Sequence, residues 1–598
     1  MKREQVDKNL TWDLSDIFKT EQLYEKALDE IKEKTCDIVK TFKGKLNCYC
    51  TINTLLEELK DLYVLIDLTS SYSSLDYETD FSNKKAFERV SNFETIISKI
   101  ISSLSFIETE ILQNDKEVIE KAIEENPQNK RFLEKLLSKK EHTLSCEVES
   151  VLASLSTSFQ APYRIYNQTK LSDLSFDDVV VDGKTYPMNF NIFEGNYEVS
   201  PDTKLRRACF KEFYKQLKKY ENTFASSYYS YVKQDKVLAD LRKYKNVFEY
   251  LLSDQEVTID MYNRQCDVIM EKLSSHIRRY IRLLKRVNGL SKMTFADLKM
   301  PLDKDFQKTY SIDDCKKMIK DGLKVLGKDY EKYLDDAFSK RCIDYVDNES
   351  KASGAFCASP YRVHPYVLLT WSGNMSDVLT VAHELGHGGH FTFCNREQSI
   401  LNTDCSTYFV EAPSTTNELI MAHYMLKNAK SNREKRWIIS EIVSKTYYHN
   451  FVTHFLESYY QREVYKMIDK DMAFDANTLN SIFKQTMQKF FGDDVELEDG
   501  VERTWIRQPH YYMGLYSYTY SASLTIGTQM CLNILKDKDA AKKWIEVLKL
   551  GGSKNPIELA KMAGVDVTTD KPLLDTIEYI GNLITQMEQL TEKIENEK

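Results

Sequence analysis

The residues best suited to chemistry in this chain are His383, Glu384 and His387, which stand in the order His-Glu-Leu-Gly-His. If this stretch is helical, two histidines at i and i+4 lie on one side of the helix with their Cβ atoms about 6 Å apart, so both imidazoles can reach one metal ion. Glu384 lies about 100° further round, where it can touch a water on that ion but cannot be a ligand. The pattern predicts a metal site with a general base.

One helix is expected to carry the motif. Ser376 and Asp377 are residue types that cap helix starts, and apolar residues follow them at helical spacing. His390 follows His387 by three residues on nearly the same face, but it lies a turn too far along to share the ion. We therefore expect His390 to pack behind the site rather than to bind metal.

A carboxylate that could complete the site stands in the segment Phe409-Val410-Glu411-Ala412-Pro413-Ser414. Proline is tolerated in the first turn of a helix, so Pro413 marks a helix start with Glu411 at its edge. Glu411 follows His383 by 28 residues, enough for a helix, a turn and a return. A second helix could then present Glu411 to the metal, and Glu418, on the same stripe, could hydrogen-bond an imidazole from behind.

These motifs resemble the zinc signature of the thimet-oligopeptidase-like metallopeptidases, and within them the oligoendopeptidase F branch. Segments 12–18, 181–184, 200–206 and 353–357 resemble that branch as well, so the likeness runs from about residue 11 to about residue 567. The resemblance implies one Zn²⁺ ion held by His383, His387 and Glu411. It also implies that Glu384 activates a zinc-bound water, and that the chain hydrolyses internal bonds of short peptides held in a deep channel.

The resemblance further implies hydrogen-bond donors for the negative oxygen that forms during amide hydrolysis. The family's histidine and tyrosine donors fall in the run from Arg507 to Tyr520, where His510 matches the histidine. The spacing to the tyrosines is about one residue shorter here. We take Tyr518 as the catalytic tyrosine, with Tyr516 and Tyr512 as alternatives. The remaining histidines, including His449 and His454, are expected to be structural.

Composition limits the partners and the compartment. The chain has 598 residues, 42% hydrophobic and 29% charged, with a net charge of −9 and no concentrated basic patch, which argues against nucleic-acid binding. Its first residues lack the apolar run of a secretory signal, and no stretch is long and apolar enough to span a membrane. The twelve cysteines are scattered, as in a reducing compartment. We expect a cytoplasmic protein, with a monomer favoured.

Helical periodicity dominates, so the predicted fold is mostly α, with a small β region beside the site helices. The resemblance implies that two helical lobes surround the channel. We assign residues 1–200 to an N-terminal helical lobe with a hairpin near 174–197, and residues 201–598 to the catalytic lobe. Segments 354–356 and 366–371 are the strand candidates near the motif. Such an edge strand could hold an extended peptide by its backbone.

Two alternatives to an endopeptidase remain open. A zinc carboxypeptidase or dipeptidyl carboxypeptidase on a related helical fold would use the same ligands but would also hold the C-terminal carboxylate of its substrate. A peptide-binding protein that retains the fold without activity is disfavoured, because all three ligands and the base are present.

Overall fold

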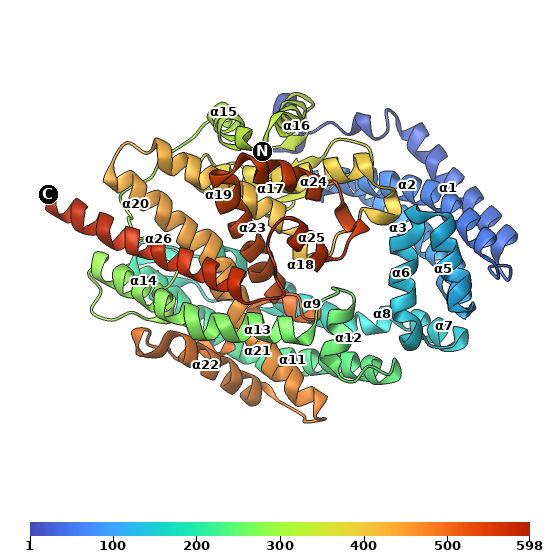
Figure 1. Ribbon diagram of the computed structural model, residues 1–598. Coiled ribbons are helices and arrows are strands. Elements are labelled where there is room, and N and C mark those ends of the chain that lie inside the picture. Colours follow the sequence, from blue (N-terminus) through green and yellow to red (C-terminus); the bar gives the residue numbers. More distant parts are fainter. Residues whose placement is uncertain (598) are drawn as a thin grey trace.

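Long amphipathic helices build nearly all of this protein, which confirms the predicted mostly α fold. The computed structural model describes residues 1–597 (Figure 1). Within that range no helix is both long enough and apolar enough to cross a membrane. Every cysteine whose side chain is described is a free thiol.

The first lobe is a helical layer with its own core, drawn in blue at one side of Figure 1. Buried side chains between Tyr24 and Leu136 form this core, separately from the larger core that begins near Tyr166. Its helices are α1 (Glu21–Phe42), α2 (Tyr49–Thr79), α3 (Lys84–Leu104), α4 (Phe106–Gln113), α5 (Lys116–Glu125) and α6 (Lys130–Lys139). The short helices α7 (Cys146–Ser154), α8 (Ser156–Phe159) and α9 (Ala161–Gln168) lead to the second lobe.

The second lobe surrounds the larger core. Its helices before the motif are α10 (Phe190–Ile192), α11 (Thr203–Leu241), α12 (Val247–Ser253), α13 (Ile259–Val268), α14 (Ser274–Val287), α15 (Ile312–Leu323) and α16 (Lys328–Ser339). From the motif onward they are α17 (Met375–Glu397), α18 (Thr407–Val410), α19 (Ala412–Asn428), α20 (Asn432–Glu441), α21 (His454–Asp469), α22 (Ala476–Phe491), α23 (Tyr518–Lys536), α24 (Lys538–Leu548), α25 (Pro556–Met562) and α26 (Lys571–Asn596).

The predicted hairpin is present as β1 (Val179–Val181) and β2 (Lys184–Tyr186), which pair antiparallel across an Asp182-Gly183 turn. Both turn residues have positive φ, the conformation that a two-residue hairpin turn of this kind needs. Val179 packs with the larger core, against residues of α11. The hairpin is therefore covered by the second lobe rather than by the helices that precede it.

A small sheet lies beside the motif helix. It has the order β3 (Ile343–Asp344), β5 (Tyr366–Leu368) and β4 (Phe356–Ala358), with β3 parallel and β4 antiparallel to the central β5. Strand β5 falls within the predicted segment 366–371, whereas β4 begins only at the last residue of the predicted segment 354–356. The two-residue strand β3 was not predicted, because it is too short to show a period.

The first eighteen residues reach across to this sheet. Trp12 is buried against Tyr366 and Leu368 of β5, and its ring meets the ring of Tyr366 edge-on at 5.9 Å. Arg3 forms an ion pair with Asp344, which Lys351 also contacts at 2.7 Å. The start of the chain thus supports the strands that border the site.

Candidate active site

The motif helix α17 begins two residues earlier than predicted. Asn374 caps it by accepting a hydrogen bond from the backbone N–H of Asp377, and the Asp377 carboxylate accepts one from the backbone N–H of Asn374. Asp377 therefore stands in the first turn of the helix and completes a capping box, while Ser376 is an ordinary first-turn residue. This fixed start sets the rotation of α17 and so the direction of its histidines.

Helix α17 crosses α19 very closely, and the two lie at the centre of the molecule with α23 (Figure 1). Gly386, inside the motif, makes the approach possible. A Cβ atom there would lie 2.5 Å from Cα of Ser414 and 2.7 Å from the carbonyl oxygen of Pro413. The glycine lets the first turn of α19 lie directly against the face of α17 that carries the histidines.

The predicted metal ligands converge. The Oε2 atom of Glu411 lies 3.3 Å from Nε2 of His383 and 3.1 Å from Nε2 of His387. Glu411 stands just before α19, as Pro413 predicted, and the Ser414 hydroxyl donates to its carboxylate at 2.8 Å. Two imidazole nitrogens and one carboxylate oxygen are the protein ligands of many catalytic zinc sites, so this donor set fits zinc.

Glu384 lies beside these ligands in a large open cleft. The cleft, with about 2080 Å³ of empty volume, is lined by His383, Glu384, His387 and Glu411 among others. Glu384 is 6% exposed. Burial raises the pKa of its carboxyl group above the ordinary value, although the two histidines oppose this rise. A carboxylate with a raised pKa holds a proton more firmly, which suits a general base.

Glu418 supports the site from behind, as its spacing predicted. Its Oε2 atom lies 3.3 Å from Nδ1 of His383, while the Thr446 hydroxyl donates to its other oxygen. His390, by contrast, is fully buried, and neither ring nitrogen has a partner among the described residues. Burial lowers the pKa of His390 to about 3, so it is a neutral packing residue.

The structure places Tyr518 away from the cleft. It is 1% exposed, its hydroxyl donates to Oε1 of Gln255 at 2.5 Å, and its ring meets Tyr262 edge-on at 4.9 Å. Tyr512 is likewise packed among aromatic rings, 4.9 Å from that of Tyr166. Neither hydroxyl faces the metal ligands.

Tyr520 instead lines the cleft, two residues further along. Its ring lies 5.4 Å from that of Tyr516 and 5.7 Å from that of His510. Burial raises the pKa of both tyrosine hydroxyls, and the charge of Glu411 adds to the rise. His510, Tyr516 and Tyr520 form one cluster beside the cleft.

The sequence reasoning missed a second group behind this cluster. The Oε2 atom of Glu457 lies 2.8 Å from Nδ1 of His454 and 3.8 Å from Nδ1 of His510. The ring of His454 stacks on Tyr520 at 4.0 Å, and its Nε2 lies 3.0 Å from Nε2 of His449, which lines the cleft. His454 and Glu457 stand three residues apart on one helix, and this spacing could have been used to predict the group from the sequence.

The wall of the cleft that carries His449 is unusual in its backbone. Residues 442–447 and 449–453 form two π-helical turns between α20 and α21. These turns supply Thr446, His449 and Thr453 to the cleft, and Tyr448, which stands between the turns, lines it as well. Such wider turns are rare and occur often at functional sites.

Comparison with known proteins identifies the family. A model of Peptidase family M3 matches residues 196–579, and a model of Oligopeptidase F matches residues 110–176. The chain belongs to peptidase family M3. This membership confirms the predicted resemblance to oligoendopeptidase F and the prediction of a metallo-endopeptidase.

M3 relatives match over nearly the whole chain. An oligoendopeptidase F homolog from Borreliella burgdorferi is 29% identical over 591 residues, 96% of this chain and 97% of the relative. One from Lactococcus lactis subsp. lactis is 27% identical and covers 99% of both chains. The fold matches that of a putative peptidase from Chlamydophila abortus, with a TM-score of 0.88 at 22% identity, covering 98% and 99% of the two chains.

Proposed function

We propose that this M3 peptidase is a zinc-dependent endopeptidase that hydrolyses internal peptide bonds of short oligopeptides. The observation that carries the proposal is the convergence of His383, His387 and Glu411 beside the buried Glu384 in an open cleft. These three residues would hold one Zn²⁺ ion, which when bound supplies a Lewis acid that lowers the pKa of water to about 7 and polarises a carbonyl group.

The side chains around the metal ligands have separate roles in hydrolysis. Glu384 takes the proton of the attacking water and passes it to the departing amine. We infer that Tyr520, in place of Tyr518, and His510 donate their O–H and N–H groups to the oxygen that becomes negative. Their rings lie 5.7 Å apart, and Tyr520 lines the cleft. Tyr516, perpendicular to Tyr520, is the alternative donor.

We propose that the backbone of the substrate peptide binds along the edge of the small sheet. Among the described residues strand β4 pairs with β5 alone, and Ala355, Phe356 and Cys357 line the cleft. An extended peptide could add to this edge through backbone hydrogen bonds, which do not depend on side-chain identity. This arrangement favours a broad range of sequences.

A zinc carboxypeptidase or dipeptidyl carboxypeptidase is kept as a second candidate because of one residue. Lys445 lines the cleft and is exposed, and no ion pair joins it to another residue within 1–597. Such a cation could hold a terminal carboxylate. Peptides with free and amidated C-termini separate the two functions, since an exopeptidase would fail on the amides.

The direct test combines a zinc assay with quenched fluorescent peptides. We expect one zinc per chain, and cleavage of a nonapeptide much faster than digestion of intact casein. Zinc-loaded protein that cleaves no peptide of five to twenty residues would refute the proposal.

A further inference from the structure

A second group of side chains that can bind a metal lies behind the cleft, apart from the three predicted zinc ligands. It consists of His454, Glu457 and His510, each of which offers one donor atom, and these three atoms lie within 4.8 Å of one another. We call this group the rear cluster. His454 and Glu457 are buried, whereas the side chain of His510 is 20% exposed. An ion could therefore reach the rear cluster from the side of His510.

Glu457 is a buried carboxylate without a permanent counter-charge. Its side chain is 3% exposed, and no Lys or Arg within residues 1–597 forms an ion pair with it. Burial opposes its ionisation, but the positive charge that His454 and His510 can carry holds the pKa of its carboxyl group down at about 2. Imidazole has an unperturbed pKa of about 6.5, so it is mostly uncharged at neutral pH. Because a buried carboxylate must be paired or bound to a metal, Glu457 needs a cation beside it.

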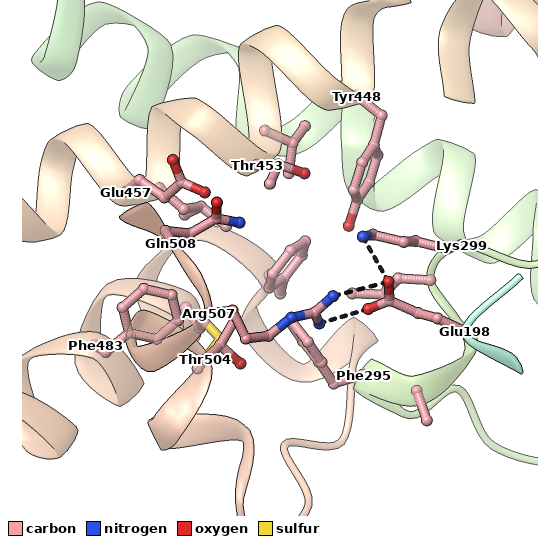
Figure 2. Close-up of a pocket in the computed structure, with 16 residues that line it drawn as sticks. Glu198, Phe295, Lys299, Tyr448, Thr453, Glu457, Phe483, Thr504, Arg507 and Gln508 are labelled. Carbon is pink, nitrogen blue, oxygen red and sulfur yellow. Dashed lines mark hydrogen bonds and ion pairs between the residues drawn. The ribbon is translucent and has the colours of Figure 1, made fainter. Parts of the chain in front are cut away.

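The permanent cations that share a pocket wall with Glu457 are already paired elsewhere. Figure 2 shows this pocket, which measures about 610 Å³ and is lined by Glu457, Arg507 and Lys299 among others. Arg507 and Lys299 both donate to the carboxylate of Glu198, at 2.6 and 2.8 Å. Separating these buried pairs would be costly, so neither cation is available to Glu457.

Two polar atoms of the rear cluster lack a hydrogen-bond partner in the part of the chain that the structure describes. They are Oε1 of Glu457 and Nδ1 of His510. The other carboxylate oxygen, Oε2, accepts from Nδ1 of His454 at 2.8 Å and from the Ser517 hydroxyl at 3.2 Å. Nδ1 of His510 lies 3.8 Å from Oε2, which is too far for a hydrogen bond. A bound cation would satisfy the carboxylate and this nitrogen together.

The spacing of the donor atoms is close to that of a zinc site. With Zn–N and Zn–O bonds of about 2.0 to 2.2 Å, neighbouring ligands of a tetrahedral ion lie about 3.3 to 3.6 Å apart. The contacts of Oε2 of Glu457 with the two Nδ1 atoms, at 2.8 and 3.8 Å, lie on either side of this range. A movement of at most about half an ångström at each contact would bring them into it. Two imidazoles and one carboxylate suit zinc or cobalt better than magnesium or calcium, which prefer oxygen ligands.

We propose that the rear cluster is a second metal site, which binds one Zn²⁺ or a similar transition-metal ion through Nδ1 of His454, the carboxylate of Glu457 and Nδ1 of His510. The ion supplies the positive charge that the buried carboxylate lacks, and it becomes the partner of the unpartnered imidazole nitrogen. It binds more weakly than the ion of the candidate active site, because it must replace the hydrogen bond between His454 and Glu457. This inference goes beyond the proposed function and does not depend on it.

The test counts bound ions in proteins that lack one site or the other. Equilibrium dialysis against free Zn²⁺ up to the micromolar range should give two ions per wild-type chain. Glu411→Ala, which lacks the first site, should keep one weakly bound ion. Glu457→Gln should keep the tight ion and bind the second at least about 10-fold more weakly, since even a group behind a ligand contributes that much.

Two controls accompany these variants. Glu463→Gln lies on the same helix, where Glu463 pairs with Lys466 at the surface, and it should bind both ions like the wild type. Dialysis against Mg²⁺ should show no ion whose binding depends on Glu457, because imidazole ligands do not suit that metal.

His510→Gln is a second variant, which removes the partly exposed ligand and leaves the buried pair of His454 and Glu457 in place. It should weaken the second ion alone, and it keeps the test decisive if Glu457→Gln fails to fold. Co²⁺ provides another readout, because its visible absorption reports its ligands. The bands that appear with the second equivalent of Co²⁺ in the wild type should be absent from both variants.

Two results would overturn the second site. Binding of a single Zn²⁺ ion throughout the micromolar range would mean that water or a protonated imidazole pairs with Glu457. A second ion bound equally well by Glu457→Gln, His510→Gln and Glu463→Gln would be an adventitious ion on the surface. Neither measurement involves peptide cleavage, so failure of the second site is distinct from failure of the proposed function, which hydrolysis decides.

Discussion

The Oε2 atom of Glu418 lies 3.3 Å from Nδ1 of His383, while Nε2 of the same ring faces Glu411. A carboxylate at Nδ1 keeps the proton on that nitrogen and leaves Nε2 free to bind a metal. The Thr446 hydroxyl in turn holds Glu418. Glu418 from α19 and Thr446 from the π-helical wall therefore hold the imidazole ring of His383 in its direction.

Replacing Glu418 with Gln should weaken zinc binding by about 10- to 100-fold, since the amide cannot hold the imidazole as strongly. Competition with a chromogenic chelator measures the affinity. Glu397→Gln, at the exposed end of α17, the helix that carries His383, is the control. Equal zinc affinities in the two variants would show that Glu418 does not support the metal site.

Replacing Glu384 with Gln should leave zinc content unchanged and lower kcat by about 10²- to 10⁴-fold, because the amide cannot accept a proton. Metal analysis and peptide hydrolysis on one preparation test both parts. Glu411→Ala should instead deplete the metal. Turnover close to wild type in Glu384→Gln would show that another residue is the base.

Removing the hydroxyl of Tyr520 should lower kcat by about 10²- to 10³-fold with little change in KM, since the hydrogen bond is expected to form in the transition state. Tyr518→Phe is the control, because that hydroxyl binds Gln255 in the core. We expect its kcat to stay within about threefold of wild type. A larger loss of kcat in Tyr518→Phe than in Tyr520→Phe would show that Tyr518, and not Tyr520, is the catalytic tyrosine.

Gly386→Ala should destabilise the protein by about 1 to 3 kcal/mol, because its methyl group would meet the backbone of α19. To relieve this contact the two helices must move apart, which separates the histidines of α17 from Glu411. Zinc affinity should therefore fall as well. Gly195 has open space around it, which makes Gly195→Ala a control. Thermal unfolding with and without zinc measures both effects, and equal melting temperatures would contradict the close crossing.

The buried carboxyl group of Asp235 should make the stability of the folded protein depend on pH. Burial raises the pKa of its carboxyl group from 3.8 to about 7, although a hydrogen bond from Tyr465 opposes the rise. Between these values the unfolded chain releases a proton that the folded chain keeps, so the folded state loses stability as pH rises. Compared with wild type, Asp235→Asn should gain up to about 4 kcal/mol between pH 4 and pH 7 and no more above it. Urea unfolding at several pH values tests this, and a constant difference would contradict it.

The sequence was sufficient to predict the positions of residues that are set by a local pattern, such as helical spacing. His383 and His387 lie one helical turn apart, and Pro413 marks the start of the next helix, so the ligand set required only two helix predictions. The β-hairpin was equally local, because an Asp-Gly turn stands between two short apolar runs.

Tyr520 could not be chosen over Tyr518 in this way. The two positions differ by about 200° around a helix, so they point in nearly opposite directions. Which of them faces the cleft depends on where α23 begins and how it packs against α13 and α19. Neither can be read from a segment in which tyrosines alternate with serine and threonine. His449 was missed because π-helical turns, which alter the usual angular spacing, set its direction.

The docking of Arg3 and Trp12 on the small sheet has a consequence for synthesis on the ribosome. Arg3 is separated from its partner Asp344 by 341 positions. At about 5 to 20 residues per second, translation takes roughly 20 to 70 seconds to reach that partner. Throughout this interval Arg3 and Trp12 have no partner on the small sheet, so the sheet beside the candidate site is completed late in synthesis.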